Sequence, residues 1–432
     1  MVYYSLNGQS PEADFRTATI NGQAPDKGLY FPVQIPKISR ELLENIRGYS
    51  DAAIAYEVIA PYTGDTIPAT VLKNIAEETV HFDIPLVPIT DRIYSLELFH
   101  GPTLAFKDTG ARFMSRCLGY FARTIKNRIV VLVATSGDTG GAVANGFYGV
   151  EGVDVVILYP SGKVSSVQEK QLTTLGGNIT ALEVNGNFDD CQRMVKEAFM
   201  DAAIRQRLLL TSANSINVAR WLPQQFYYFF LWKQWEDKQH PPVVAVPSGN
   251  FGNICAGLLA AVSGLPLKQF LAACNANDVV PRFLETGVYE PTSAIATISN
   301  AMDVGDPSNF VRILELFGKQ AGNLRQLLKA GTVSDEQTRQ TLLDVFQQQG
   351  YLLDTHGAVA FTVLAGYLGQ QPGQRGVLLE TAHPVKFYDV IEPLIGQAIP
   401  LPEVVAGQMQ KKKQSILMEP SLEALKEFLM HF

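Results

Sequence analysis

The chain has 432 residues, of which 47% are hydrophobic and 18% are charged, and its formal net charge at pH 7 is −7. This composition predicts a soluble globular protein with a large core, and a chain of this length commonly forms two or three domains. The negative charge, without a sustained basic stripe, argues against a nucleic-acid-binding protein.

No feature of the sequence predicts a membrane segment or a metal site. The apolar runs 129–134 and 226–232 are far shorter than the ~20 residues that span a bilayer. The N-terminus lacks a basic region followed by an apolar stretch, so we expect no signal peptide. The cysteines form no CxxC pair and the histidines no HExxH motif. We therefore expect a reduced, cytoplasmic protein without a catalytic metal.

In chain order, residues 1–95 read as a mixed segment without a cluster of catalytic residue types. It contains a predicted helix near Ser39–Gly48 and an apolar periodic stretch over Thr70–Val80. We expect this N-terminal extension to pack against the core as a scaffold.

From residue 129 onward, continuous apolar runs of strand length alternate with helical periodicity. Ile129–Ala134 precedes the turn TSGDTGGA and a helix. The pattern returns as the strand Val153–Leu158 with the helix Gln168–Leu175, and as the strand Ile179–Val184 with a helix from 188 to about 200. This alternation predicts parallel strands with helical crossovers, in a sheet covered on both faces.

A second run of the same kind follows, with strands at Val243–Val246, Phe270–Cys274 and Gly376–Leu379. The first of these strands leads into PSGNFGN and a helix. Between residues 309 and 369 the pattern is mostly helical, with helices predicted at 310–317, at 323–329, from the N-cap Ser334 to Gly350, and at 355–368.

These elements predict an α/β fold of two αβ domains with mostly parallel sheets. We expect residues 1–95 to pack on the large domain. Residues 96–112 and 208–432 are predicted to form that large domain, and residues 113–207 the small αβ domain.

Lys107, in the stretch LFHGPTLAFKDTGARFM, is a candidate for chemistry. An amine held near apolar walls resists protonation and becomes a nucleophile or base at neutral pH, which suits a Schiff base with a carbonyl compound. The alternative is a packed lysine at a helix start whose ammonium pairs with Asp108.

Three loops carry polar groups suited to anions. Thr135–Gly141 (TSGDTGG) and Ser248–Asn253 (SGNFGN) stand between a strand and a helix, where backbone N–H groups converge. Asn214–Arg220 (NSINVAR) adds amides, a hydroxyl and a guanidinium. The alternatives are tight turns without a ligand, and, for the third loop, helix capping by Asn214 or Ser215 with Arg220 exposed to solvent.

The segments GPTLAFKD, TSGDTGGA, NSINVAR, PSGNFGN, SNAMDVGDPSNF and ETAHPVKF, in this order, resemble threonine synthases. These are pyridoxal-phosphate (PLP) enzymes of the tryptophan-synthase-β-like fold (fold type II). The opening MVYYSLNG and the GLYFP turn also resemble that family. The resemblance covers nearly the whole chain and implies conversion of O-phospho-L-homoserine and water to L-threonine and phosphate, the last step of threonine biosynthesis.

The resemblance also implies residue roles. Lys107 matches the lysine that forms the Schiff base with the cofactor and moves protons at the substrate. Residues implied to bind the cofactor are Gly249, Asn250, Phe251, Gly252 and Asn253 at its phosphate, Thr381 at its ring nitrogen, and Asp138. Residues implied to bind the substrate are Ser136, Gly137 and Thr139 at its carboxylate, with Thr139 alternatively facing its phosphate, and Asn214, Ser215 and Arg220 at its phosphate.

Asp138 departs from the pattern, because related members of the fold carry asparagine there, next to the phenolic oxygen of the cofactor. An ionised aspartate cannot donate a hydrogen bond to a phenolate. Either Asp138 is protonated, or it points elsewhere, or the phenolic oxygen carries the proton.

The nearest rival function is a dehydratase or phospholyase of the same fold that releases 2-oxobutyrate. A rival of another class is a ligand-binding protein that has lost turnover, against which Lys107, the SGNFGN loop and Thr381 argue. We expect a small-molecule substrate, no nucleic-acid or membrane partner, and a monomer or homodimer.

Overall fold

The computed structural model describes residues 1–431, whose strands form three sheets. A three-stranded antiparallel sheet has the order β2-β1-β3, a six-stranded sheet the order β12-β11-β10-β13-β5-β4, and a five-stranded sheet the order β14-β8-β7-β6-β9. The strands are β1 (Val2–Ser5), β2 (Ala13–Asp14), β3 (Tyr30–Pro32), β4 (Leu86–Pro88), β5 (Ile93–Glu97), β6 (Ile129–Ala134), β7 (Val153–Pro160), β8 (Ile179–Val184), β9 (Leu209–Thr211), β10 (Val243–Pro247), β11 (Gln269–Cys274), β12 (Leu328–Thr332), β13 (Gly376–Glu380) and β14 (Ile416–Met418).

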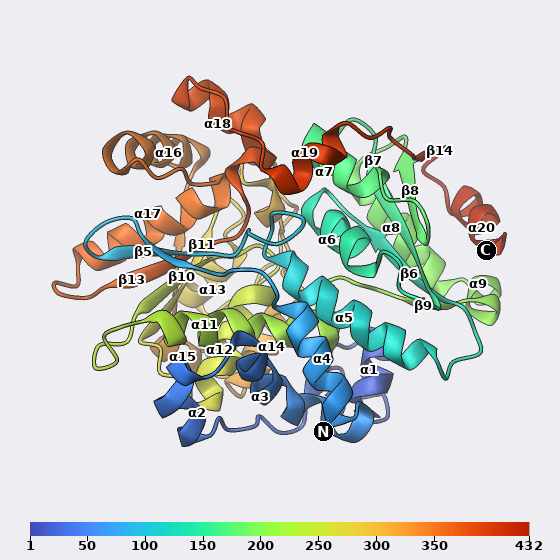
Figure 1. The fold of residues 1–432 in the computed structure, drawn as a ribbon, viewed down its shortest axis with the longest axis horizontal. Helices are drawn as coiled ribbons and strands as arrows, with labels where there is room; N and C mark the ends of the chain where they lie inside the picture. The colour runs from blue at the N-terminus through green and yellow to red at the C-terminus, as the bar shows by residue number, and fades with distance from the viewer. Residues whose placement is uncertain (432) are drawn as a thin grey trace.

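The helices connect and cover these sheets (Figure 1). They are α1 (Phe15–Asn21), α2 (Arg40–Asn45), α3 (Asp51–Thr63), α4 (Ala69–Thr79), α5 (Lys107–Ala122), α6 (Asp138–Phe147), α7 (Ser166–Thr173), α8 (Phe188–Met200), α9 (Ala202–Arg207), α10 (Val218–Trp221), α11 (Gln225–Gln234), α12 (Gly252–Ser263), α13 (Val279–Thr286), α14 (Phe310–Leu316), α15 (Ala321–Leu327), α16 (Asp335–Gln349), α17 (Thr355–Gly369), α18 (Tyr388–Ile395), α19 (Glu403–Met409) and α20 (Leu422–Met430). Among residues 1–431, no helix combines the length and apolar character that a membrane span requires.

The six-stranded sheet is parallel except for β4 at its edge and is buried on both faces. Val244 and Val246 of β10 pack into one apolar cluster, whereas Val243 and Ala245 pack into another. Successive strand residues point to opposite faces, so a strand between two apolar layers needs apolar residues at every position. We call this part of the molecule the six-stranded half; it lies on the left in Figure 1.

The five-stranded sheet is entirely parallel and shows the same two-sided burial. In β6, Val131 and Val133 face one cluster, while Val130 and Leu132 face another that includes residues of α8 and α20. This part, the five-stranded half, lies on the right in Figure 1, with α5 running between the two halves.

These two parallel sheets confirm the predicted α/β class. The strands Ile129–Ala134 and Ile179–Val184 and the helix that follows the latter have the predicted bounds. The helix predicted over 323–329 is wrong at its end, because α15 stops at Leu327 and the chain continues as β12, paired in parallel with β11. Helix α3 was not predicted, and it packs between α4 and α11.

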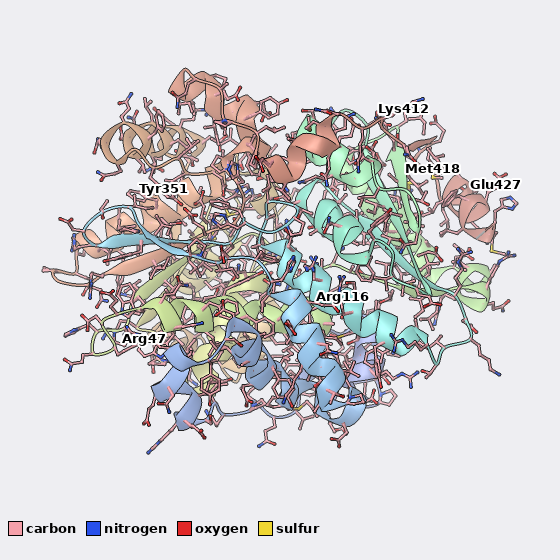
Figure 2. The ribbon with its side chains drawn as sticks, in the orientation of Figure 1. Arg47, Arg116, Tyr351, Lys412, Met418 and Glu427 are labelled. Atoms are coloured by element: carbon pink, nitrogen blue, oxygen red, sulfur yellow. The ribbon has the colours of Figure 1, made fainter. Side chains whose placement is uncertain are left out.

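The C-terminal segment crosses from one half to the other. After α18, α19 contacts α7, β14 pairs with β8, and α20 packs on α8. Figure 2 shows Met418 of β14 in the five-stranded half, far from Tyr351 in the six-stranded half. Residues 208–432 were all predicted in the large domain, but β9 and β14 lie in the five-stranded sheet. Pairing at the sheet edges places β9 and β14 in the five-stranded sheet. Strands this short carry no hydrophobic pattern in the sequence from which that pairing could be predicted.

Candidate active site

Lys107 is the first residue of α5, at the end of the loop that follows β5. This loop runs along the segment after β13. The N–H of Leu98 donates to the carbonyl of Glu380 at 2.9 Å, and the N–H of Phe106 donates to the carbonyl of Thr381 at 2.9 Å. Lys107 and Thr381, which are far apart in the sequence, are therefore held close together.

The amine of Lys107 is surrounded by charged groups from three other segments. Burial lowers its pKa, Asp138 raises it, and Lys386 and Arg220 lower it further, so that the pKa lies below its ordinary value. Asp108 is not its partner, because that carboxylate accepts hydrogen bonds from the N–H and the hydroxyl of Thr103 at 2.9 and 2.6 Å. A lysine with a lowered pKa is a better nucleophile and base near neutral pH.

The loop Gly249–Asn253 joins β10 to α12. Its five backbone N–H groups find no acceptor within residues 1–431. Phe251 holds a left-handed backbone with φ of 59°, and a Cβ on Gly249 would lie 2.5 Å from Cα of Met302. Unpaired N–H groups gathered at the start of a 12-residue helix form a cradle for an anion such as phosphate.

Ser215 lies against this loop. Its hydroxyl oxygen accepts from the amide of Asn250 at 2.7 Å and from that of Asn309 at 3.0 Å. Both amide orientations are set by other bonds, since Oδ1 of Asn250 accepts from the N–H of Ser308 and Oδ1 of Asn309 accepts from Arg312. With both lone pairs used, the hydroxyl of Ser215 can only donate its hydrogen, which suits an anion at the loop.

The loop Thr135–Gly141 joins β6 to α6. The hydroxyl of Thr135 accepts from the N–H groups of Gly137 and Gly140 at 3.0 and 2.9 Å. Gly137 has φ of 140°, and a Cβ there would lie 2.4 Å from the side chain of Gln168, so glycine is required. Within the described chain, the N–H groups of Ser136, Asp138 and Thr139 have no acceptor. This loop is a second anion cradle.

Asp138 forms an ion pair with Lys386, a residue that the sequence analysis did not identify. Its Oδ1 lies 2.7 Å from Nζ of Lys386 and accepts from Nε2 of Gln168 at 3.0 Å. Burial by itself would raise the pKa of Asp138, but Lys386 and Lys107, with the hydrogen bonds from Lys386 and Gln168, bring that pKa well below its ordinary value. Asp138 is therefore ionised and paired, which is not the protonated state left open from sequence.

Two residues of the segment Asn214–Arg220 contact different parts of the candidate site. Ser215 lies at the Gly249–Asn253 loop, while Nη1 of Arg220 donates to the carbonyl of Lys107 at 3.2 Å. Arg220 is only 4% exposed and its Nε has no partner in the described chain, so the predicted solvated alternative is wrong. The cap of α10 is Asn217, not Asn214 or Ser215.

The structure thus brings Asp138, Lys386 and Arg220 close enough to Lys107 to shift its pKa, and it ties the residue before Lys107 to Thr381. The residues missed from sequence are Lys386, Gln168, Asn309 and Arg312. Lys386 stands in the ETAHPVKF segment that carried the resemblance, so that motif was the available signal. Arg312 lies in an ordinary helical pattern, which gave no signal of a role at the site.

The chain is similar to known proteins over its whole length. The family model of pyridoxal-phosphate dependent enzymes matches residues 85–381, which places the chain in that class of enzyme. The structure fits the cofactor, because a lysine of lowered pKa and a cradle of free N–H groups at the start of a helix are both present.

Two further models, the threonine synthase N terminus and C-terminal models, match residues 2–80 and 357–429. The threonine synthase of Serratia marcescens is 42% identical and is aligned over 100% of this chain and 99% of its own length. The crystal structure of threonine synthase from Escherichia coli matches with a TM-score of 0.92 at 40% identity, with 100% of both chains covered. The PLP-bound threonine synthase from Brucella melitensis matches with a TM-score of 0.93 at 36% identity, over 100% of this chain and 99% of that one. The chain belongs to the threonine synthase family.

Proposed function

We propose that Lys107 binds the cofactor and moves the protons as this chain converts O-phospho-L-homoserine and water to L-threonine and phosphate. The observation that carries this proposal is a buried amine of lowered pKa that faces Asp138 of one cradle, together with a second cradle of unpaired N–H groups at the loop Gly249–Asn253. One cradle suits a cofactor phosphate and the other a substrate carboxylate.

We assign the Gly249–Asn253 loop and the hydroxyl of Ser215 to the cofactor phosphate, and Thr381 to the ring nitrogen. The contact between Ser215 and Asn250 supports moving Ser215 from the substrate phosphate to this loop. When bound, pyridoxal phosphate supplies an electron-withdrawing imine and ring that make the protons at Cα and Cβ of the substrate acidic.

We assign the substrate carboxylate to the Thr135–Gly141 loop, through the N–H groups and hydroxyls of Ser136 and Thr139, with Gly137 allowing the close approach. Arg220 and Asn214 remain the candidates for the substrate phosphate, supported by the unpaired Nε of Arg220.

In this arrangement Lys107 removes a proton from Cα and then one from Cβ of the substrate, and phosphate leaves from Cγ. Protonation at Cγ, addition of water at Cβ and return of a proton to Cα then give L-threonine. Water must be kept from releasing a 2-oxo acid instead, and the burial of Asp138, Arg220 and Lys386 supports a site with limited access to solvent.

Lys107→Ala tests the proposal. The wild type should show the visible absorbance of the cofactor imine and release phosphate and threonine in equal amounts, while the variant should do neither. Lys126→Ala, at an exposed lysine just beyond the same helix, is the control and should behave as the wild type. Phosphate released together with 2-oxobutyrate in place of threonine would favour the phospholyase alternative.

We also infer that the protein acts in the cytoplasm as a monomer or homodimer. The four cysteines are buried and free, which suits a reducing compartment. Light scattering of the purified protein tests the oligomeric state, and a trimer or larger assembly would contradict the proposal.

A further inference from the structure

A buried carboxylate stands inside a loop that we assign to an anion. Asp138 is the first residue of α6 and is 7% exposed, and the unpaired N–H groups of Ser136 and Thr139 flank it. A substrate carboxylate bound there would meet a second negative charge a few ångströms away. Such like charges repel strongly where water is excluded, so the loop needs a counter-ion.

Lys386, from the six-stranded half of the molecule, is positioned to be this counter-ion. It lies in the 3-10 turn Pro384–Phe387, which follows β13, and the residue is 1% exposed. Its ammonium is 2.7 Å from Oδ1 of Asp138 and donates to the carbonyl of Thr103 at 2.8 Å. Asp138 belongs to the five-stranded half, whereas Lys386 and Thr103 belong to the six-stranded half, so the ion pair crosses the boundary between them.

A second contact crosses the same boundary. Nε2 of Gln171, in α7, donates to the carbonyl of Thr103 at 3.1 Å. The carbonyl of Thr103 therefore receives one donor from each half. If the halves move apart, Asp138 loses its only ion-pair partner in the described chain and keeps its charge within the loop.

We propose that Lys386 is the counter-ion that allows the Thr135–Gly141 loop to bind a carboxylate, and that it acts only when the two halves are together. The proposal rests on the proposed role of that loop. Lys386 is a positioning residue in this scheme, because it acts on the substrate through Asp138. Approach of the two halves then switches the loop from repelling an anionic substrate to binding it.

The groups that face Asp138 are Lys386 from the turn after β13, Lys107 from α5 and the neutral Gln168 from α7. In the working enzyme the amine of Lys107 is committed to the cofactor and to proton transfer. Lys386 is therefore the cation that stays beside Asp138 as long as the two halves are together, and its exchange for a neutral residue leaves the charge of Asp138 without a partner.

The test compares Lys386→Met, Asp138→Asn and the double variant, each as the PLP-loaded protein. Two probes are titrated while the visible absorbance of the cofactor is followed: L-threonine, and 1-amino-2-propanol, which is threonine without its carboxylate. We expect Lys386→Met to weaken threonine binding by about tenfold or more and to leave the amine within about twofold. The double variant, which removes both charges, should recover threonine binding to within about threefold.

Repeating the titrations at pH 6 and pH 8.5 adds a second readout. In Lys386→Met, the unpaired and buried Asp138 takes up a proton more readily, so the threonine defect should be smaller at pH 6. The ratio of the threonine to the amine affinity cancels the ionisation that the two probes share. In the wild type this ratio should change little between the two pH values.

Equal weakening of both probes in Lys386→Met would overturn the proposal, because it would show that the ion pair only holds the fold together. Unchanged threonine binding in that variant, or no recovery in the double variant, would also overturn it. Should Lys386→Met fail to fold, Asp138→Asn decides, since its threonine-to-amine ratio must equal or exceed that of the wild type. A wild type that responds to neither probe would remove this proposal together with the proposed function.

Discussion

Arg312 is fully buried, and its guanidinium contacts no carboxylate among residues 1–431. Its N–H groups donate instead to the carbonyls of Tyr30, Ser215 and Ile216 and to the amide oxygen of Asn309, and the guanidinium stacks over Trp221 at 4.4 Å. A buried charge is tolerated when each of its donors finds an acceptor. This residue thereby ties the N-terminal extension to the loop that carries Ser215.

Arg312→Met should lower the free energy of unfolding by roughly 3 kcal/mol, because it leaves several buried carbonyls without a donor. It should also weaken binding of pyridoxal phosphate, since the orientation of Asn309, and with it that of Ser215, is no longer held. Denaturant unfolding and a cofactor titration measure the two effects. Arg325→Met, at an exposed position of α15, should stay within about 0.5 kcal/mol of the wild type; similar losses in both variants would contradict this account.

At the scale of elements, both cradles occur where a parallel strand passes into a helix, β6 into α6 and β10 into α12. The glycines in these loops are required by close approach of other segments. Gly249 is packed against the backbone of Met302, and Gly137 against the side chain of Gln168. The N–H groups can then point toward a ligand without a side chain in the way.

Gly249→Ala should weaken cofactor binding by about tenfold or more, because its Cβ would lie 2.5 Å from Cα of Met302 and the loop must shift its N–H donors. A titration of the cofactor-free protein with pyridoxal phosphate measures this. Gly366→Ala is the control: nothing lies within 4 Å of a Cβ there and the residue is inside α17. It should raise stability by about 0.5–1 kcal/mol and leave cofactor binding unchanged. Normal cofactor affinity in Gly249→Ala would show that the loop does not contact the phosphate.

At the scale of the whole molecule, the C-terminal segment ties the two halves together. Before β14, Nζ of Lys413 lies 2.6 Å from Glu169 and 2.7 Å from Glu183 of the five-stranded half. Burial by itself would raise the pKa of Glu183, but hydrogen bonds from Lys413, Ser161 and Ser415 lower it to about 2. The last strand of the chain is thus held at the sheet edge by charge as well as by backbone pairing.

The depressed pKa of Glu183 predicts how this attachment depends on pH. A carboxyl group whose pKa is lower in the folded protein stabilises it above the ordinary pKa of 4.5, and this contribution is lost as the pH falls toward about 2. Lys413→Met should therefore be less stable than the wild type at pH 7, and the difference should shrink below pH 4.5. Thermal unfolding across this range measures it. Lys412→Met, at the exposed neighbour labelled in Figure 2, should follow the wild type, and a pH-independent difference in Lys413→Met would contradict the assignment.

Much of the fold could be predicted from local pattern. Strand β6 is buried on both faces and apolar at every position, so its bounds are visible in the sequence. Strand β8 is apolar except at the half-buried Thr180 and Glu183, and its bounds are visible too. β12 was missed because LKAGT has no such run. Its second to fifth residues are partly or fully exposed, and only the pairing with β11 makes it a strand.

For the candidate site, the sequence alone determined which residues are candidates, because Lys107, the two glycine loops and Thr381 stand in motifs long enough to identify. Only the tertiary structure showed which of these residues contact one another. It placed Ser215 at the loop Gly249–Asn253, Arg220 at the backbone carbonyl of Lys107, and Lys386 against Asp138. Hydrogen bonds and ion pairs depend on distances of a few ångströms between segments far apart in the chain. A motif records which groups are present, but only folding brings a charge from one half of the molecule against a charge from the other.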